Sequence, residues 1–222
     1  MKTAVLVDAD FYLRQRRRFF SQDRSDDPSQ GADDLWTHCI KHVDRDRGHR
    51  LYRIFVYDCP PLSKKVHHPQ TGRPIDLSQT ATAQFRRNFH ERLKAKRNVA
   101  LRLGYLDERN AKWKLRNGDT EMQVLKGKMS VADLSEGDFT YHAIQKGVDM
   151  KIGLDIAAMT LKRLVDRVVL IAGDSDFVPA AKFARREGVE FTLDPMHKPI
   201  RADLQEHIDG LDTTLPNRRK EE

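Results

Sequence analysis

The chain has 222 residues, a formal net charge of +7 at pH 7 and a mean hydropathy of −0.68. No stretch approaches the roughly 20 apolar residues of a membrane span, and the N-terminus runs into a strand pattern rather than a signal peptide. The two cysteines, Cys39 and Cys59, are too few for a disulfide framework, and no CxxC motif offers a thiolate metal site. We therefore expect a cytoplasmic protein that has no membrane partner.

The first half of the chain predicts strands that alternate with helices. Apolar runs predict strands at 3–7, 51–57 and 99–103, and apolar residues at helical spacing predict helices at 11–20, 32–47 and 78–97. The polar segment 21–31 predicts a flexible loop, and 63–74 a second long loop. Asp33 and Asp34 would favour the N-terminus of the middle helix through its dipole.

The second half continues this alternation after a basic insertion. Segment 104–141 contains Trp113, short apolar alternations and glycines at turn positions, which predict a hairpin-like insertion. Beyond it, the pattern predicts helices at 145–165, 177–186 and 201–208, strands at 168–171 and 189–193, and a charged tail at 216–222. The whole pattern predicts an α/β three-layer sandwich with a mainly parallel central sheet, as a single domain over residues 1–215.

Aspartates follow two of the predicted strands. Asp8 and Asp10 come after the first strand, and Asp174 and Asp176 come after the strand at 168–171. Parallel sheets bind ligands at the carboxyl ends of their strands, where these carboxylates would repel one another unless a cation neutralised them. Oxygen ligands favour Mg²⁺ or Mn²⁺, which can promote phosphodiester cleavage. An aspartate in this position is also a common helix cap, and Asp176 alone could be one.

Two further aspartates lie on the helix predicted at 145–165. Asp149 falls near its start and Asp155 lies six residues later. At roughly 100° per residue the two side chains are about 120° apart, so both need not face one site. We favour Asp149 as the member of the acidic cluster.

Positive charge gathers in segments 14–18, 45–53, 86–97 and 112–128, which favours a polyanionic partner such as nucleic acid. Trp113, Tyr105 and Phe139 are interleaved with basic residues and could stack on bases or belong to the core. His38 and His42 flank Cys39 in a metal-like spacing, but their place on an amphipathic helix favours packing.

The segments KGVDMKIGLDIAAM and VVLIAGDSDFVPAAKFARREGVEFTL, with VLVDAD near the N-terminus, resemble the NYN-domain (LabA-like) family, a branch of the PIN-like nuclease superfamily. The specific match covers about residues 145–193, the first strand supports it, and 104–141 lies outside it. The resemblance implies a PIN-like Rossmannoid sheet and a ribonuclease that holds Mg²⁺ or Mn²⁺ for RNA cleavage. Its metal and catalytic residues correspond here to Asp8, Asp149, Asp174 and Asp176.

Two acidic positions relate differently to the family pattern. Asp10 stands where the family usually has asparagine, so it keeps an oxygen ligand and adds charge, and Asp155 matches an acidic position often present there. Both are candidate supporting ligands.

Two other functions stay open. A haloacid-dehalogenase-like phosphatase would use Asp8 and Asp10 as its nucleophile and acid, although Phe11 and Tyr12 then follow where that family has Gly or Thr. A non-catalytic RNA-binding or assembly module would keep the fold without turnover. RNA against DNA, the number of ions and a homo-oligomeric state are likewise open.

Overall fold

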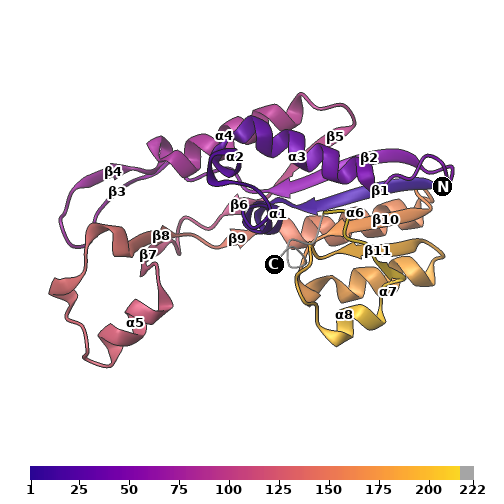
Figure 1. Cartoon of the computed structure of the whole chain (residues 1–222). Helices are drawn as coiled ribbons and strands as arrows, with labels where there is room; N and C mark the ends of the chain where they lie inside the picture. The colour runs from indigo at the N-terminus through magenta and orange to yellow at the C-terminus, as the bar shows by residue number, and fades with distance from the viewer. Residues whose placement is uncertain (216–222) are drawn as a thin grey trace.

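The computed structural model describes residues 1–215, and the charged tail predicted at 216–222 lies outside them. At its centre is a six-stranded sheet in which every neighbouring pair is parallel (Figure 1). In spatial order its strands are β12 (Gly210–Leu211), β11 (Glu190–Asp194), β10 (Arg167–Ile171), β1 (Lys2–Asp8), β2 (Arg50–Asp58) and β5 (Val99–Leu103). The chain therefore starts at the centre with β1 and adds β2 and β5 on one side. It then adds β10, β11 and β12 on the other side, so the strand order reverses between β1 and β10, as in doubly wound folds.

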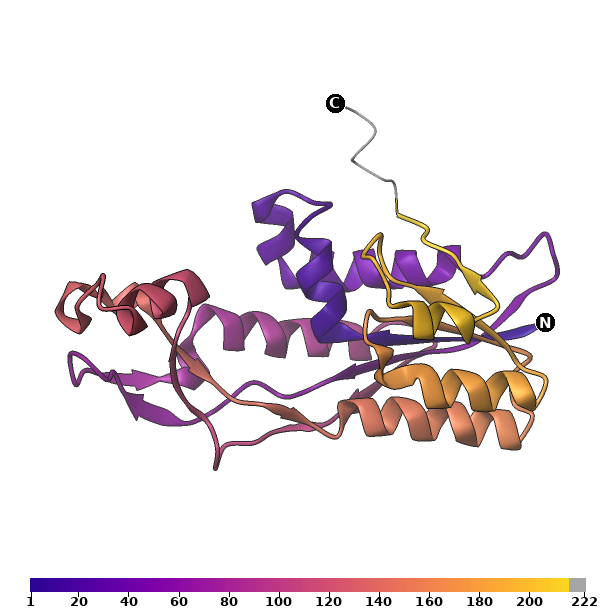
Figure 2. The ribbon, with the colours of Figure 1, turned by 90° about the horizontal axis from the view of Figure 1, so that it is seen from below.

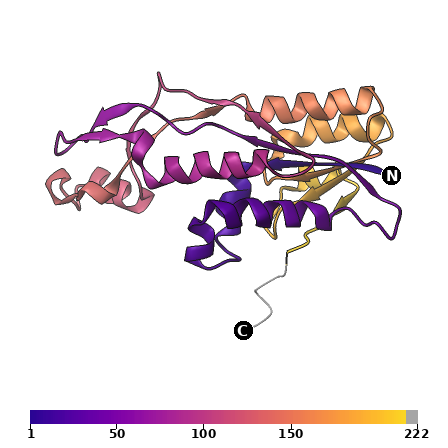
Figure 3. The same cartoon turned by 90° about the horizontal axis from the view of Figure 1, so that it is seen from above.

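Helices cover both faces of this sheet. One face carries α6 (Val148–Leu161), α7 (Val178–Arg186) and α8 (Ala202–Glu206), and the other α1 (Ala9–Arg16), α3 (Pro28–Lys41) and α4 (Ala81–Lys94) (Figure 3). Strand alternation separates two cores: Ala4 and Leu6 of β1 pack on the first side, Val5 and Val7 on the second. All four side chains are fully buried. The predicted α/β three-layer sandwich with a parallel sheet is confirmed.

A lobe projects beyond the carboxyl ends of the strands (Figures 1 and 2). We use this name for residues 59–80 and 104–147, which follow β2 and β5. The lobe contains three antiparallel strand pairs and α5 (Gly118–Leu125): β3 (Lys65–His67) with β4 (Pro74–Asp76), β6 (Tyr105–Leu106) with β9 (Gln145–Lys146), and β7 (Lys112–Leu115) with β8 (Phe139–His142). The hairpin predicted in the basic insertion is thus β7–β8, and the loop predicted at 63–74 is largely the β3–β4 hairpin.

The segment between α1 and β2 differs from the prediction. A short helix, α2 (Gln22–Asp26), replaces the predicted loop, and α3 begins at Pro28 because Asp27 caps it and proline suits the first helical turn. The carboxylate of Asp27 accepts hydrogen bonds from the backbone of Ser29 and Gln30. Asp34 therefore lies inside the helix, where it pairs with Arg16 rather than with the helix dipole.

The helix predicted at 145–165 is shorter than expected. Its first residues form β9, and Gly147 adopts φ 79°, a left-handed conformation that lets the chain turn into α6. The edge strand β12 was missed, because two residues carry no periodic signal. None of the helices in residues 1–215 has the length and apolar character needed to cross a bilayer.

Candidate metal centre at the carboxyl edge of the sheet

The predicted aspartates meet where the strand order reverses. Asp8 is the last residue of β1, and Asp174 follows β10 after a two-residue turn. β1 and β10 are paired in parallel register, so both carboxylates emerge at the same edge. Gly173 allows this turn to pass close to α1, since a Cβ there would lie 2.4 Å from Cε2 of Phe11. This crevice is the usual ligand position in doubly wound sheets.

Asp8 is held in place by the helix that follows it. Its Oδ1 accepts hydrogen bonds from the backbone N–H groups of Asp10 and Phe11, each at 3.1 Å, so it is the N-cap of α1. Burial raises the pKa of Asp8 to about 6, and the nearby carboxylates of Asp10 and Asp149 act in the same direction. The cap uses one oxygen and leaves the other for a ligand.

Asp149 lies near both Asp8 and the loop that follows β10. It lies in the first turn of α6, where loss of hydration and the negative charges of Asp174 and Asp176 raise its pKa. Asp174 caps the short 3₁₀ turn Ser175–Phe177 by accepting from the backbone N–H of Asp176 at 3.1 Å. Asp176 itself caps no helix, because α7 begins after Phe177 without a side-chain cap. The helix-cap interpretation of Asp176 is therefore wrong.

These four carboxylates differ from their acidic neighbours in their ion pairs. Across residues 1–215, Asp8, Asp149, Asp174 and Asp176 form no ion pair with lysine, arginine or histidine, whereas neighbouring acidic residues do. No three of their ligand atoms gather within 4.8 Å of one another in the described chain, so the cluster is open. An open set of hard oxygen donors fits a hydrated divalent ion such as Mg²⁺, which keeps several waters and takes few carboxylates.

Asp10 is neutralised by the protein. Its two oxygens lie 3.1 Å from Nη2 of Arg86 and 3.2 Å from Nη2 of Arg14. Arg86 also binds the fully buried Asp58, the last residue of β2, at 2.5 Å. Asp10 is thus part of an ion-pair network at the border of the site.

Asp155 faces away from this cluster. Its Oδ2 accepts a hydrogen bond from the hydroxyl of Tyr57 at 2.8 Å and lies 3.3 Å from Nε of Arg102. These partners come from β2 and β5, so Asp155 ties α6 to the sheet. The structure brings Asp149, the favoured member of the pair, toward Asp174 and Asp176 and gives Asp155 other partners.

Sequence reasoning missed the network around Asp58. His90 Nε2 lies 2.8 Å from Asp58 Oδ2, and Arg86 binds the other oxygen. Burial alone would raise the pKa of Asp58, but the hydrogen bond from His90 and the charge of Arg86 hold this pKa below its usual value. An aspartate at the end of a strand pointed to Asp8, and the same sequence signal could have identified Asp58.

A second buried cluster lies at the end of β11. Nε2 of His38 and Nε2 of His42 lie 2.6 and 2.8 Å from the same oxygen of Asp194, and all three side chains are buried. Within the described residues, these three side chains form the group whose potential metal-ligand atoms all lie within 4.8 Å of one another. His42 also contacts Asp212 at 3.4 Å, and these two carboxylates raise its pKa despite its burial. The cluster fastens α3 to β11 and could also accept a metal ion.

The sequence matches the NYN domain family over residues 74–208, more than half of the chain. The chain belongs to the NYN-domain family. The matched range includes Asp149, Asp174 and Asp176 and runs through 104–141, which the resemblance in sequence motifs did not cover, while Asp8 lies before it. NYN domains are part of the PIN-like nuclease superfamily.

One solved structure also matches this NYN-domain protein, with lower similarity than the family match. A crystal structure of a protein of unknown function from Vibrio parahaemolyticus is 16% identical, covers 95% of this chain and 90% of that chain, and has a TM-score of 0.43. The chain has no match among curated proteins.

Proposed function

We propose that this NYN-domain protein is a metal-dependent ribonuclease that hydrolyses RNA phosphodiesters at Asp8, Asp149, Asp174 and Asp176. The observation that carries the proposal is the contrast at the sheet edge: within residues 1–215 these four carboxylates form no ion pair with a basic side chain, while Asp10 and Asp58 do. Burial and neighbouring carboxylates raise the pKa values of Asp8 and Asp149. A bound cation would favour the ionised form of both groups, so these raised pKa values support a cation site.

The aspartates would hold Mg²⁺ or Mn²⁺, and Asp10 and Asp155 are left as outer supports. When bound, such ions activate water and stabilise the charge that develops on the phosphodiester. Asp8 and Asp174 are both positioned by backbone hydrogen bonds, so their free oxygens are presented at the edge without large side-chain freedom.

Basic side chains beside the site can hold the phosphate backbone. A cavity of ≈ 410 Å³ adjoins Asp10 and is lined by Arg14, Arg17 and Arg86 among others. Arg14 and Arg17 pair with Asp10 and Asp26, but their side chains are 69% and 68% exposed, so their guanidinium groups can also reach phosphate oxygens. The excess positive charge of the chain supports the same partner.

Cleavage of labelled single-stranded and hairpin RNA tests the proposal. The wild-type protein should cleave in Mn²⁺ or Mg²⁺ and not in chelator, and Asp174→Asn should lower the rate at least about 100-fold, because loss of even an outer partner of a metal ligand costs 10–100-fold. Asp46→Asn is the matched control, since it makes the same charge change on an exposed loop before β2, at the opposite edge of the sheet.

Three outcomes would be informative in different ways. Loss of metal-dependent cleavage in Asp174→Asn alone supports the nuclease. RNA binding without cleavage by the wild type would instead assign a non-catalytic binding module. Equal cleavage by wild type and Asp174→Asn would show that the acidic cluster is not the active site.

A further inference from the structure

We propose that the cavity between α4 and the β7–β8 hairpin is a groove for single-stranded RNA, with a base against Trp113 and a phosphate at Arg116. This inference rests on the proposed function and specifies the form of its substrate. The groove is built by the lobe, outside the acidic cluster.

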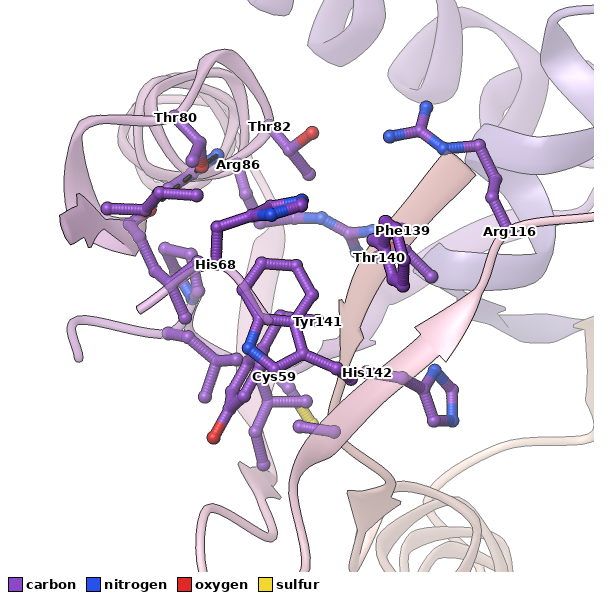
Figure 4. Close-up of a pocket in the computed structure, with 18 of the residues that line it drawn as sticks. Cys59, His68, Thr80, Thr82, Arg86, Arg116, Phe139, Thr140, Tyr141 and His142 are labelled. Carbon is purple, nitrogen blue, oxygen red and sulfur yellow. Dashed lines mark hydrogen bonds between the residues drawn. The ribbon is translucent and has the colours of Figure 1, made fainter. Parts of the chain in front are cut away.

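The cavity has a volume of ≈ 520 Å³ and two dissimilar walls. One wall comes from the connection after β2 and from α4, including Thr82 and Arg86, and the other from the hairpin, including Arg116 and Tyr141 (Figure 4). This volume falls in the range of sites that enclose one small organic ligand, about 300–1,000 Å³. It suits an unstacked nucleotide and does not admit a duplex, whose bases are stacked inside.

Aromatic side chains on the hairpin wall are held rigidly. Trp113 donates from Nε1 to the backbone oxygen of His67 at 2.9 Å and packs edge-to-face with the rings of His68 and Tyr141, at centroid distances of 5.2 and 5.4 Å. Trp113, Tyr141 and Phe139 remain only half-buried and line the cavity. A rigid aromatic platform of this kind binds bases by stacking and tolerates different sequences.

One arginine of the groove is available to a ligand. Arg116 is exposed and, within residues 1–215, forms no ion pair, unlike Arg73, which binds Glu136 at 2.7 Å. Asp10 and Asp58, the partners of Arg86, lie at the acidic edge. Of these arginines, Arg116 lies away from the acidic edge, and within residues 1–215 its guanidinium group has no ion-pair partner. It could therefore bind a phosphate of a polyanion in the groove.

Arg86 joins this groove to the proposed cleavage site. It lines the larger cavity on one side and, with Thr82, the ≈ 410 Å³ cavity next to Asp10 on the other. A strand held along the lobe would thus pass Arg86 as it reaches Asp10 and then Asp8. Unstacked bases held on aromatic side chains are the feature that distinguishes single-strand from duplex recognition.

The two tryptophans of the chain make a direct test practical. Trp36 lies with Arg45 and Arg50 in a cavity at the amino ends of the strands, so Trp36→Phe leaves Trp113 as the sole reporter. In an Asp174→Asn background, a 12-residue oligouridylate should quench the fluorescence of the Trp36→Phe protein. The Trp113→Phe protein, which reports from Trp36, should show no quenching, and an RNA duplex of equal length should bind more weakly to both.

Affinity variants complete the test. Trp113→Leu should weaken oligouridylate binding roughly 5- to 100-fold, the effect of losing one stacked base. Arg116→Gln should weaken it and lower the slope of log K against log salt by about 0.7, the effect of one lost phosphate contact. Arg45→Gln, an exposed arginine at the opposite edge, is the matched control. Arg116→Gln keeps the proposal testable if Trp113→Leu disturbs the hairpin.

The outcomes separate this inference from the proposed function. Quenching of Trp113 and a selective effect of Arg116→Gln, in a protein whose wild type does not cleave RNA, would keep the groove and reject the nuclease. Metal-dependent cleavage with no Trp113 quenching and with equal affinity of Arg116→Gln and Arg45→Gln would reject the groove and keep the nuclease. Preference for the duplex would also reject the groove.

Discussion

Replacing Asp8 by asparagine should stabilise the metal-free protein at neutral pH. The side chain has nearly the same shape, and asparagine is as good an N-cap as aspartate, so the hydrogen bonds to α1 can persist. What changes is the charge. A carboxyl pKa raised from 3.8 to about 6 means that ionised Asp8 opposes folding by about 3 kcal/mol.

The effect has a defined pH dependence. Well below pH 3.8 the carboxyl group is protonated in both the folded and the unfolded chain, and the penalty is absent. Between its unfolded pKa of 3.8 and its folded pKa of about 6 the folded state binds more protons, so stability falls as pH rises. The advantage of Asp8→Asn should therefore be small at pH 4, about 0.5 kcal/mol, and approach its full value above pH 6.

Urea unfolding at pH 4, 5, 6 and 7.5 without metal measures this difference. Asp58→Asn is the matched control at the neighbouring strand end, and it should destabilise by about 3–5 kcal/mol because Arg86 and His90 lose a buried partner. Adding Mn²⁺ should stabilise the wild type and have less effect on Asp8→Asn. Destabilisation by Asp8→Asn at pH 7.5, or a gain independent of pH, would refute the charge-balance reasoning behind the proposed centre.

Two further substitutions test elements that support the site. Asp194→Asn should lower the free energy of unfolding in urea by about 3–5 kcal/mol, because it leaves two buried histidines without their shared carboxylate. This loss should shrink at alkaline pH, where His42, whose pKa is raised, gives up its proton. An unchanged unfolding midpoint would contradict this role. Gly173→Ala should displace the turn or the ring of Phe11, which a Cβ would approach to 2.4 Å, and so lower cleavage more than global stability; a fully active variant would show that the turn tolerates the shift.

The sequence predicted the central fold because its signals are local. Continuous apolar runs such as the one in β10 are typical of strands buried on both faces, and the helices between them carry one apolar side. The lobe was harder, since its short strands are paired with residues far along the chain. Lys112, for example, pairs with His142 across an intervening helix. Such pairings depend on long-range contacts that periodicity does not encode.

The sequence predicts where the candidate site lies, but not the ion pairs that surround it. Strand ends pointed to Asp8 and Asp174. Helical spacing only separated Asp149, which we favoured, from Asp155, whose partners prove to be Tyr57 and Arg102. The role of Arg86 could not be read from its segment, because it is one of several basic residues on the helix and only burial separates it from them. The same holds for Asp194, whose histidine partners come from α3.

The departure at Asp10 is explained by its partner. Asparagine would bring an oxygen without charge, whereas Asp10 adds a negative charge that Arg86 balances at 3.1 Å. Arg86 is in turn held by Asp58, so the guanidinium cannot swing into the cluster and neutralise Asp8. The negative charge that no ion pair balances within residues 1–215 therefore stays at Asp8, Asp149 and the loop after β10, and under the proposed function a divalent cation would balance it. This confinement is the physical reason to separate Asp10 from the proposed ligands.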